Sequence, residues 1–169
     1  ANLERADMIA LTRADLVDAQ VRAEIRRRVE QIKPDVPWLE LSHAPQTLVN
    51  ADGREEPLSR LAQRSVAAFC GIGNPSAFRQ TIQASQYDLV AWREFPDHHR
   101  YTREDVESLT AWANTSEAEA IVCTQKDLVK INIDQLGDVP LWAVSIGMEF
   151  VYGHERLETA LEKLLAEIR

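Results

Sequence analysis

Short apolar runs alternate with helical patterns along almost the whole chain, and this alternation limits the possible folds more than any other feature of the sequence. Short apolar runs are typical of buried strands, and apolar residues spaced by three and four are typical of amphipathic helices. Strands and helices that alternate form βαβ units, with parallel strands covered by helices on both faces. We therefore predict an α/β fold, a Rossmann-like three-layer sandwich with a mostly parallel sheet, as a single domain over residues 1–169.

The same periodicity places the individual elements along the chain. Strands are expected at residues 8–11, 38–41, 65–70, 88–92, 120–123 and 141–146, with a further edge strand at 149–152. Helices are expected at residues 15–32, 75–84, 103–114 and 124–131, then a last helix with an apolar stripe of Leu157, Leu161, Leu164, Leu165 and Ile168. Cys70 and Cys123 each end a short apolar run, so both thiols are expected to be buried and reduced, as in a cytosolic protein.

The charge and hydropathy of the chain exclude some functions. The net charge of −8 argues against nucleic-acid binding, which depends on Lys and Arg at phosphates. No apolar stretch approaches the roughly 20 residues that cross a bilayer, and no signal peptide is visible. The chain begins Ala1-Asn2-Leu3, which we interpret as the start of a fragment of a longer protein.

The helix starts carry strong capping signals. In three of them a Thr precedes an Asp by three residues, so the hydroxyl can cap the helix while the carboxylate reaches back to the Thr N–H. These pairs are Thr12 with Asp15, Thr102 with Asp105, and Thr124 with Asp127. Asn74 and Pro75 mark a fourth start, with Asn as the cap and Pro at the first helical position.

Polar residues follow the ends of several predicted strands. They lie in the segments 69–75, 95–101 and 123–127. The carboxyl ends of parallel strands share one edge of the sheet, and open α/β proteins bind their ligands at that edge. We therefore expect these three segments to lie along one side of the molecule.

The triplet Asp97-His98-His99 is the sharpest candidate for chemistry. Imidazole titrates near neutral pH and can accept a proton or polarise a hydroxyl, and a neighbouring carboxylate can fix its tautomer. The alternative is a helix-entry loop with two solvated imidazoles. From the residues alone, both interpretations stay open.

The segment Gly71-Ile72-Gly73-Asn74-Pro75 offers a second candidate, a close approach of the backbone to a nucleotide or substrate at Gly71, Gly73 and Asn74. Its first glycines resemble a dinucleotide fingerprint, but Ser76 stands where the third glycine belongs. Pro75 also removes an N–H that could hold a phosphate. A tight strand-to-helix turn that needs two glycines is the favoured alternative.

Other candidates near a nucleotide or substrate are weaker. Lys126, next to Thr124, could meet a phosphate, and Arg13 with Asp15 is similar in pattern to a base-reading motif of nucleotide-binding folds. Capping and solvation explain both pairs equally well. The run of arginines at residues 26–28 could contact anionic lipid, although a solvated helix face is the simpler interpretation.

Several catalytic motifs are missing from the sequence. No GxxxxGK[ST] occurs, so no phosphate cradle of the P-loop kind is expected. Neither HExxH nor a nucleophilic Ser elbow occurs, and the two cysteines have no metal-ligand spacing. No metal site is therefore predicted.

Taken in order, the segments 5–15, 69–78, 95–102 and 124–130 resemble the tetraacyldisaccharide 4′-kinase family in the part that follows its P-loop domain. The resemblance covers nearly the whole chain. No single segment is decisive, but four segments at the expected spacing are specific. One departure is Gln125, because the family usually has Glu there within Thr-Thr-Glu-Lys-Asp.

The resemblance implies transfer of the γ-phosphoryl group of ATP, with Mg²⁺, to the 4′-hydroxyl of a tetraacyldisaccharide 1-phosphate in lipid A biosynthesis. It implies a bacterial cytoplasmic enzyme that is peripheral on the cytoplasmic face of the inner membrane. The Walker motifs and the main membrane-docking segment are implied to lie in an N-terminal P-loop domain that is absent from this chain. That domain and the lipid disaccharide are the expected partners, and this chain alone is expected to be inactive and to bind no cofactor tightly.

The resemblance also implies roles for the histidine loop. One histidine would assist an Asp of the N-terminal domain in activating the sugar hydroxyl. His98 is the first choice for this role and His99 the second, with Asp97 beside them.

Two other function classes compete with the lipid kinase. The Asp-His-His triplet also occurs in DHH-type metal-dependent phosphoesterases, although those need further Asp-rich motifs that are not obvious in this sequence. A non-catalytic Rossmann-like binding module is the third hypothesis. Tight Mn²⁺ binding would favour the phosphoesterase, and full activity after substitution of His98 and His99 would favour the binding module.

Overall fold

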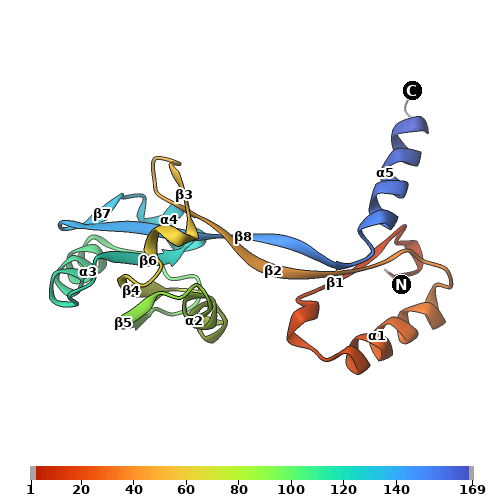
Figure 1. The fold of residues 1–169 in the computed structure, drawn as a ribbon, viewed down its shortest axis with the longest axis horizontal. Helices are drawn as coiled ribbons and strands as arrows, with labels where there is room; N and C mark the ends of the chain where they lie inside the picture. The colour runs from red at the N-terminus through yellow and green to blue at the C-terminus, as the bar shows by residue number, and fades with distance from the viewer. Residues whose placement is uncertain (1–2, 168–169) are drawn as a thin grey trace. The chain divides into compact units, whose positions relative to one another are not determined.

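The computed structural model describes residues 3–167, and the chain divides into two compact units. The larger unit is formed by residues 45–146, and the smaller unit by residues 1–44 and 147–169. Two long strands, β2 (Trp38–Val49) and β8 (Val139–Tyr152), have residues in both units (Figure 1). The expectation of one domain over residues 1–169 stays a prediction.

The larger unit is built on a mostly parallel sheet with strand order β2-β8-β6-β4-β5. Three of its strands are β4 (Ser65–Cys70), β5 (Asp88–Glu94) and β6 (Ala120–Thr124). β4 pairs in parallel with both β5 and β6, and β6 pairs in parallel with β8. Two short strands are antiparallel, with β3 (Glu55–Pro57) on β2 and β7 (Gln135–Leu136) on β8.

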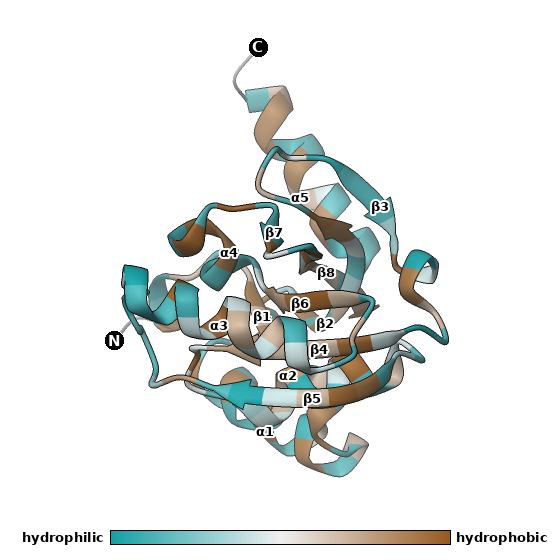
Figure 2. Ribbon diagram, turned by 90° about the vertical axis from the view of Figure 1, so that its left-hand side faces the viewer, coloured by the Kyte–Doolittle hydropathy of each residue, from teal (hydrophilic) through white to brown (hydrophobic). Residues whose placement is uncertain are grey.

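Helices cover both faces of this sheet. α2 (Pro75–Ala84) packs on one face, while α3 (Arg103–Thr115) and α4 (Gln125–Ile131) pack on the other. Successive residues of β4 point to opposite faces, so Ala68 lies in the α2 cluster and Phe69 in the α3 and α4 cluster. The central strand β6 is coloured hydrophobic over much of its length in Figure 2. The predicted α/β class, with a mostly parallel sheet between helical layers, is confirmed.

The smaller unit contains β1 (Ile9–Thr12), α1 (Ala19–Ile32) and α5 (His154–Glu167). β1 pairs in parallel with β2, and α1 packs on these strands through Val29, which is buried with Trp38. Along α5 the apolar stripe is partly open, with Leu161, Leu164 and Leu165 exposed. Ile168, the last residue of the predicted stripe, lies outside the described residues.

The structure corrects three predicted elements. The helix expected at 15–32 is a 3₁₀ turn (Ala14–Leu16) followed by α1, because Arg13 adopts the left-handed conformation (φ 56°) and Asp18 caps α1 by accepting the N–H of Val21. The strand expected at 38–41 continues to Val49 as β2. The strands expected at 141–146 and 149–152 are one strand, β8, which continues without a break through Gly147.

The capping predictions have mixed outcomes. The Thr102–Asp105 capping box is complete, Thr124 accepts the N–H of Asp127, and Asn74 accepts the N–H of Ala77. The capping pair predicted at Thr12 and Asp15 is wrong, because α1 does not start there. Both cysteines are buried, as predicted, and burial together with the nearby carboxylate of Asp127 raises the pKa of Cys70 to about 12.

Within residues 3–167, no helix has both the length and the apolar character that a bilayer span requires.

Candidate functional site

Three loops of the larger unit meet at the carboxyl edge of its parallel strands. They follow β4, β5 and β6 and include residues 71–74, 95–102 and the start of α4. The backbone N–H of Gly71 donates to the carboxylate of Asp127, and the phenol of Tyr101 donates to the same carboxylate at 3.0 Å. The predicted convergence of the three segments is confirmed by these contacts.

The carboxyl group of Asp127 is the centre of this convergence. Its side chain is fully buried, and it accepts hydrogen bonds from the Gly71 N–H at 3.2 Å and from the Thr124 hydroxyl at 2.6 Å, besides that from Tyr101. A buried carboxylate is costly unless it is hydrogen-bonded, and these donors from three loops supply the compensation. Burial and the Asp127 carboxylate raise the pKa of Tyr101, so its phenol remains a donor at neutral pH.

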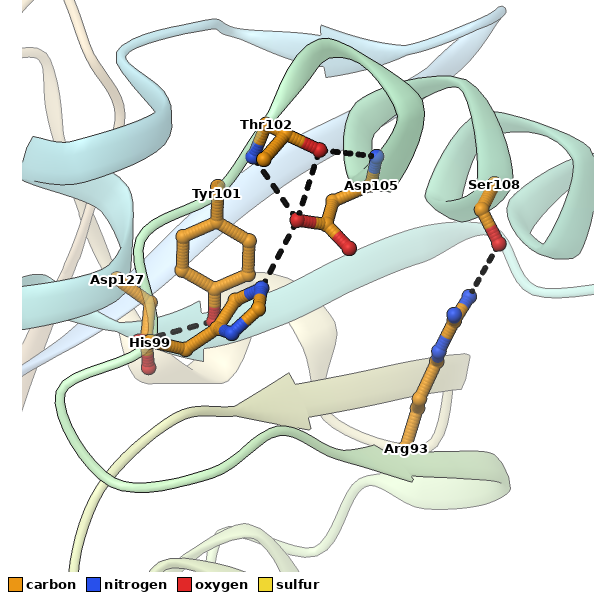
Figure 3. Close-up of polar contacts among 7 residues, drawn as sticks. All are labelled: Arg93, His99, Tyr101, Thr102, Asp105, Ser108 and Asp127. Carbon is orange, nitrogen blue, oxygen red and sulfur yellow. Dashed lines mark hydrogen bonds and ion pairs between the residues drawn. The ribbon is translucent and has the colours of Figure 1, made fainter.

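His99 is held inside an aromatic cluster. Its ring stacks on Phe95 with centroids 4.8 Å apart and meets Tyr101 edge-on at 5.0 Å. Its Nε2 atom lies 2.9 Å from Oδ2 of Asp105 (Figure 3). Packing on two sides and a carboxylate partner together fix the orientation of this imidazole.

One oxygen of Asp105 contacts both the start of α3 and the His99 imidazole. Oδ2 accepts from the backbone N–H of Thr102 at 2.9 Å and from its hydroxyl at 3.1 Å, in addition to the His99 contact. The hydrogen bond from the Thr102 N–H lowers the pKa of Asp105 below its usual range, and the hydrogen bond with the His99 imidazole is the second largest cause. The start of α3 and the position of His99 therefore depend on the same atom.

His98 presents the opposite situation. Its side chain is 85% exposed, and its backbone is left-handed with φ 59°. The backbone N–H of His98 donates to Asp97 Oδ1 at 3.0 Å, and Nε2 lies 3.7 Å from Asp97 Oδ2, within reach of an ion pair when the ring is protonated. The loop thus carries one anchored imidazole and one exposed imidazole.

The glycine segment is fitted closely to its neighbours. A Cβ atom at Gly71 would lie 3.1 Å from the Tyr101 hydroxyl and 3.3 Å from the Cβ of His99. At Gly73 it would lie 3.1 Å from Oδ2 of Asp97, so a carboxylate stands close to this backbone. Asn74 uses its side chain as the cap of α2. These contacts are those of a tight turn packed against the histidine loop.

The remaining predicted residues are distributed differently. Thr124 caps α4 and donates to Asp127, while Lys126 is exposed in the first turn of the same helix. Arg13 and Asp15 belong to the smaller unit, where both are exposed and Arg13 precedes the 3₁₀ turn. Arg27 and Arg28 form ion pairs with Glu24, which is typical of a solvated helix face.

Sequence reasoning gave three residues of this region no specific partner in another loop. Tyr101 was named only as the end of the segment 95–101, and Asp105 and Asp127 were expected only to cap helices. The structure adds the contacts of Asp105 with His99 and of Asp127 with Gly71 and Tyr101. The spacing of Thr and Asp in the sequence signals the caps but contains no information on these partners from other loops.

The described residues do not by themselves fit a metal or a triphosphate. Among the described residues 3–167, no group of three or more His, Cys, Asp or Glu side chains is arranged to hold a metal ion. The Gly71 N–H is already engaged by Asp127, and Asp97 stands at Gly73, where a phosphate would be repelled.

The lowered pKa of Asp105 predicts how stability changes with acidity. Above the pKa of an unfolded Asp, about 3.9, the ionised carboxylate stabilises the folded state, and this contribution is lost as the pH falls through the lower folded pKa. Asp105→Asn should therefore lower the melting temperature at pH 7, and the gap to the parent should shrink below about pH 4. Melting curves between pH 2 and pH 7 check this. Glu104→Gln, an exposed neighbour in the same turn, is the control, and a gap that is independent of pH would contradict the assignment.

The fold and the site define a class of protein: an α/β domain in which the carboxyl edge of the parallel strands carries one anchored and one exposed histidine. Comparison with known proteins narrows the class. The model of the tetraacyldisaccharide-1-P 4′-kinase family matches residues 1–166. The chain belongs to this family, and the resemblance inferred from its motifs is confirmed.

Individual relatives agree with the family match. A tetraacyldisaccharide 4′-kinase of Anaeromyxobacter sp. (strain K) is 32% identical over 167 residues, which cover 97% of this chain and 44% of the relative. That of Syntrophus aciditrophicus is 36% identical over 107 residues, covering 63% of this chain and 29% of the relative. The chain therefore spans less than half the length of these curated relatives.

A solved structure shares the fold. The crystal structure of LpxK from Aquifex aeolicus in complex with ATP superposes with a TM-score of 0.57 over 92% of this chain and 51% of that one, at 22% sequence identity. This similarity supports the α/β architecture.

Proposed function

We propose that this chain is the C-terminal part of a lipid kinase that phosphorylates the 4′-hydroxyl of a tetraacyldisaccharide 1-phosphate in lipid A biosynthesis. The family match over residues 1–166 carries the proposal. It favours the kinase over a DHH-type phosphoesterase and over a non-catalytic binding module. The coverage of 44% of a relative's length is that expected for one part of a larger enzyme.

In this proposal the two histidines have different tasks. His98 is the imidazole that meets the substrate, because its ring is 85% exposed and Asp97 lies beside it to stabilise a positive charge. It accepts the proton of the 4′-hydroxyl, alone or with a carboxylate of the rest of the enzyme, as the oxygen attacks the phosphorus. His99 anchors the loop through Asp105 and the aromatic cluster.

The triphosphate and its metal ion belong to the rest of the enzyme in this proposal. ATP supplies the γ-phosphoryl group, as the ATP complex of the Aquifex aeolicus relative suggests. The residues of this chain contact the sugar that accepts the phosphoryl group. There they orient the histidine loop and accept the proton of the 4′-hydroxyl. The enzyme is proposed to act on the cytoplasmic face of the inner membrane, where a tetraacylated substrate resides, with most membrane contacts made outside this chain.

The test compares two lengths of the protein. The protein at its full encoded length and a version limited to residues 1–169 are incubated with tetraacyldisaccharide 1-phosphate, Mg²⁺ and labelled ATP. We expect transfer of label to the 4′-position by the full-length protein and none by residues 1–169. Circular dichroism and a melting curve establish that the short version is folded.

Two outcomes would contradict the proposal. Turnover by residues 1–169 would show that this part alone holds the triphosphate. A full-length protein that leaves the lipid unphosphorylated while it hydrolyses a phosphodiester with Mn²⁺ would favour the phosphoesterase hypothesis.

A further inference from the structure

Asp127 stands out among the ionisable groups because its side chain is completely buried. Within residues 3–167 it is the one buried charged side chain, with 0% exposure. Capping α4 does not require this, because the cap is made by the Thr124 hydroxyl, which accepts the Asp127 N–H at 3.3 Å. Besides the Thr124 hydroxyl, the carboxyl group accepts from two other loops, through the Gly71 N–H and the Tyr101 hydroxyl. A fully buried carboxylate at this position therefore needs an explanation beyond the helix start.

A continuous set of contacts leads from Asp127 to the histidine loop. Tyr101 donates to Asp127 at 3.0 Å, and its ring meets the His99 ring edge-on at 5.0 Å. The Cα of Gly71 faces the same place, since a Cβ there would contact Tyr101, Asp127 and His99 together. The next residue after Tyr101 is Thr102, which shares Oδ2 of Asp105 with His99. Asp127 therefore holds Tyr101, whose ring packs against His99, while Asp105 contacts Nε2 of the His99 ring directly.

We infer that Asp127 is a positioning residue, which acts through Tyr101 to hold the His99 imidazole and with it the substrate-facing His98. The inference rests on the proposed function, since it names what orients the loop in that reaction. Asp127 lies too deep to touch substrate, so its effect is on geometry. Small errors in geometry are costly in catalysis, and a displacement of about 1 Å can lower a rate about 100-fold.

The chain offers a matched pair of tyrosines for the test. Tyr101 and Tyr87 are both largely buried, and each phenol makes one hydrogen bond, from Tyr101 to Asp127 at 3.0 Å and from Tyr87 to the Leu58 carbonyl at 2.9 Å. Tyr101→Phe and Tyr87→Phe remove the same atom and one hydrogen bond each. Only the first change breaks the link to the histidine loop.

The measurements are made on the protein at its full encoded length. We expect Tyr101→Phe to lower kcat about 10-fold to about 100-fold with little change in KM for the lipid, and Tyr87→Phe to leave kcat unchanged. Imidazole resonances in ¹H–¹³C NMR spectra report the geometry independently of turnover. The His99 signal should shift in Tyr101→Phe and in Asp127→Asn, and stay in place in Tyr87→Phe.

The outcomes separate this inference from the proposed function. If His98→Asn is impaired while Tyr101→Phe matches Tyr87→Phe in kcat and in the His99 signal, the positioning role is overturned and the proposed function stands. If the parent protein does not phosphorylate the lipid, the proposed function fails, and the role in phosphotransfer fails with it. An Asp127→Asn protein that does not fold leaves Tyr101→Phe to decide the question.

Discussion

Replacing His98 by Asn is expected to lower kcat of the full-length protein about 100-fold while its melting temperature changes little. A positioned general base contributes at least this factor, and Asn has no group that titrates near neutral pH. The His98 side chain is 85% exposed, so its loss removes little packing. Asn is the replacement of choice because, unlike most residues, it tolerates the left-handed backbone found here, with φ 59°. Steady-state kinetics and calorimetry on the same preparations provide the measurement.

A control separates the loss of this imidazole from the loss of any imidazole. His154 begins α5 in the smaller unit, and its side chain is 57% exposed. His154→Asn should leave kcat at the parent value. His98→Ala should match His98→Asn in kcat but be less stable, because Ala pays a steric cost in the left-handed region. Equal activity of His98→Asn and the parent protein would refute the catalytic assignment.

The second large effect is expected from Gly153→Ala, which should lower the free energy of unfolding by about 3 kcal/mol. Gly153 has φ 86°, and a Cβ atom there would lie 2.6 Å from the backbone oxygen of Trp38 and 2.9 Å from the Leu39 side chain. The left-handed backbone costs Ala about 1–2 kcal/mol, and overpacking against a strand costs about 1–3 kcal/mol more. Chemical denaturation followed by circular dichroism measures the change.

Gly53 isolates the backbone contribution from the steric one. It has φ 78°, similar to Gly153, but a Cβ atom there would meet nothing within 4 Å. Gly53→Ala should therefore cost only about 1–2 kcal/mol. If Gly153→Ala and Gly53→Ala lower the free energy of unfolding equally, the close contact of Gly153 with β2 adds no steric cost, and the expected difference between the two variants is wrong.

Much of the larger unit could be predicted from the sequence because local signals agree with the fold. α2 has both bounds where Asn74, Pro75 and the apolar spacing place them, and β4 coincides with its apolar run. Short buried strands between capped helices leave little freedom in the choice of element. The meeting of the three loops also followed from sequence, since parallel strands deliver their carboxyl ends to one edge.

The rest depended on contacts between distant residues. Arg13 adopts a left-handed conformation that no residue pattern in this segment signals. The helix expected from residue 15 therefore begins later, with Asp18 as its cap. β2 and β8 continue past their apolar runs, where polar residues and Gly147 hide the strand pattern. The different environments of His98 and His99, which are adjacent in sequence, arise from Phe95, Tyr101 and Asp105 in the folded loop.

The alternation along β4, which sends Ala68 to one helical layer and Phe69 to the other, also bears on insertions and deletions. One amino acid added or removed near the start of this strand would rotate every later side chain to the opposite layer, so that Phe69 would leave the α3 and α4 layer and enter the α2 layer. Gly71, the first residue after the strand, would then no longer face Tyr101. Single substitutions in β4 disturb one layer, whereas a change of length by one residue disrupts both layers and the histidine loop together.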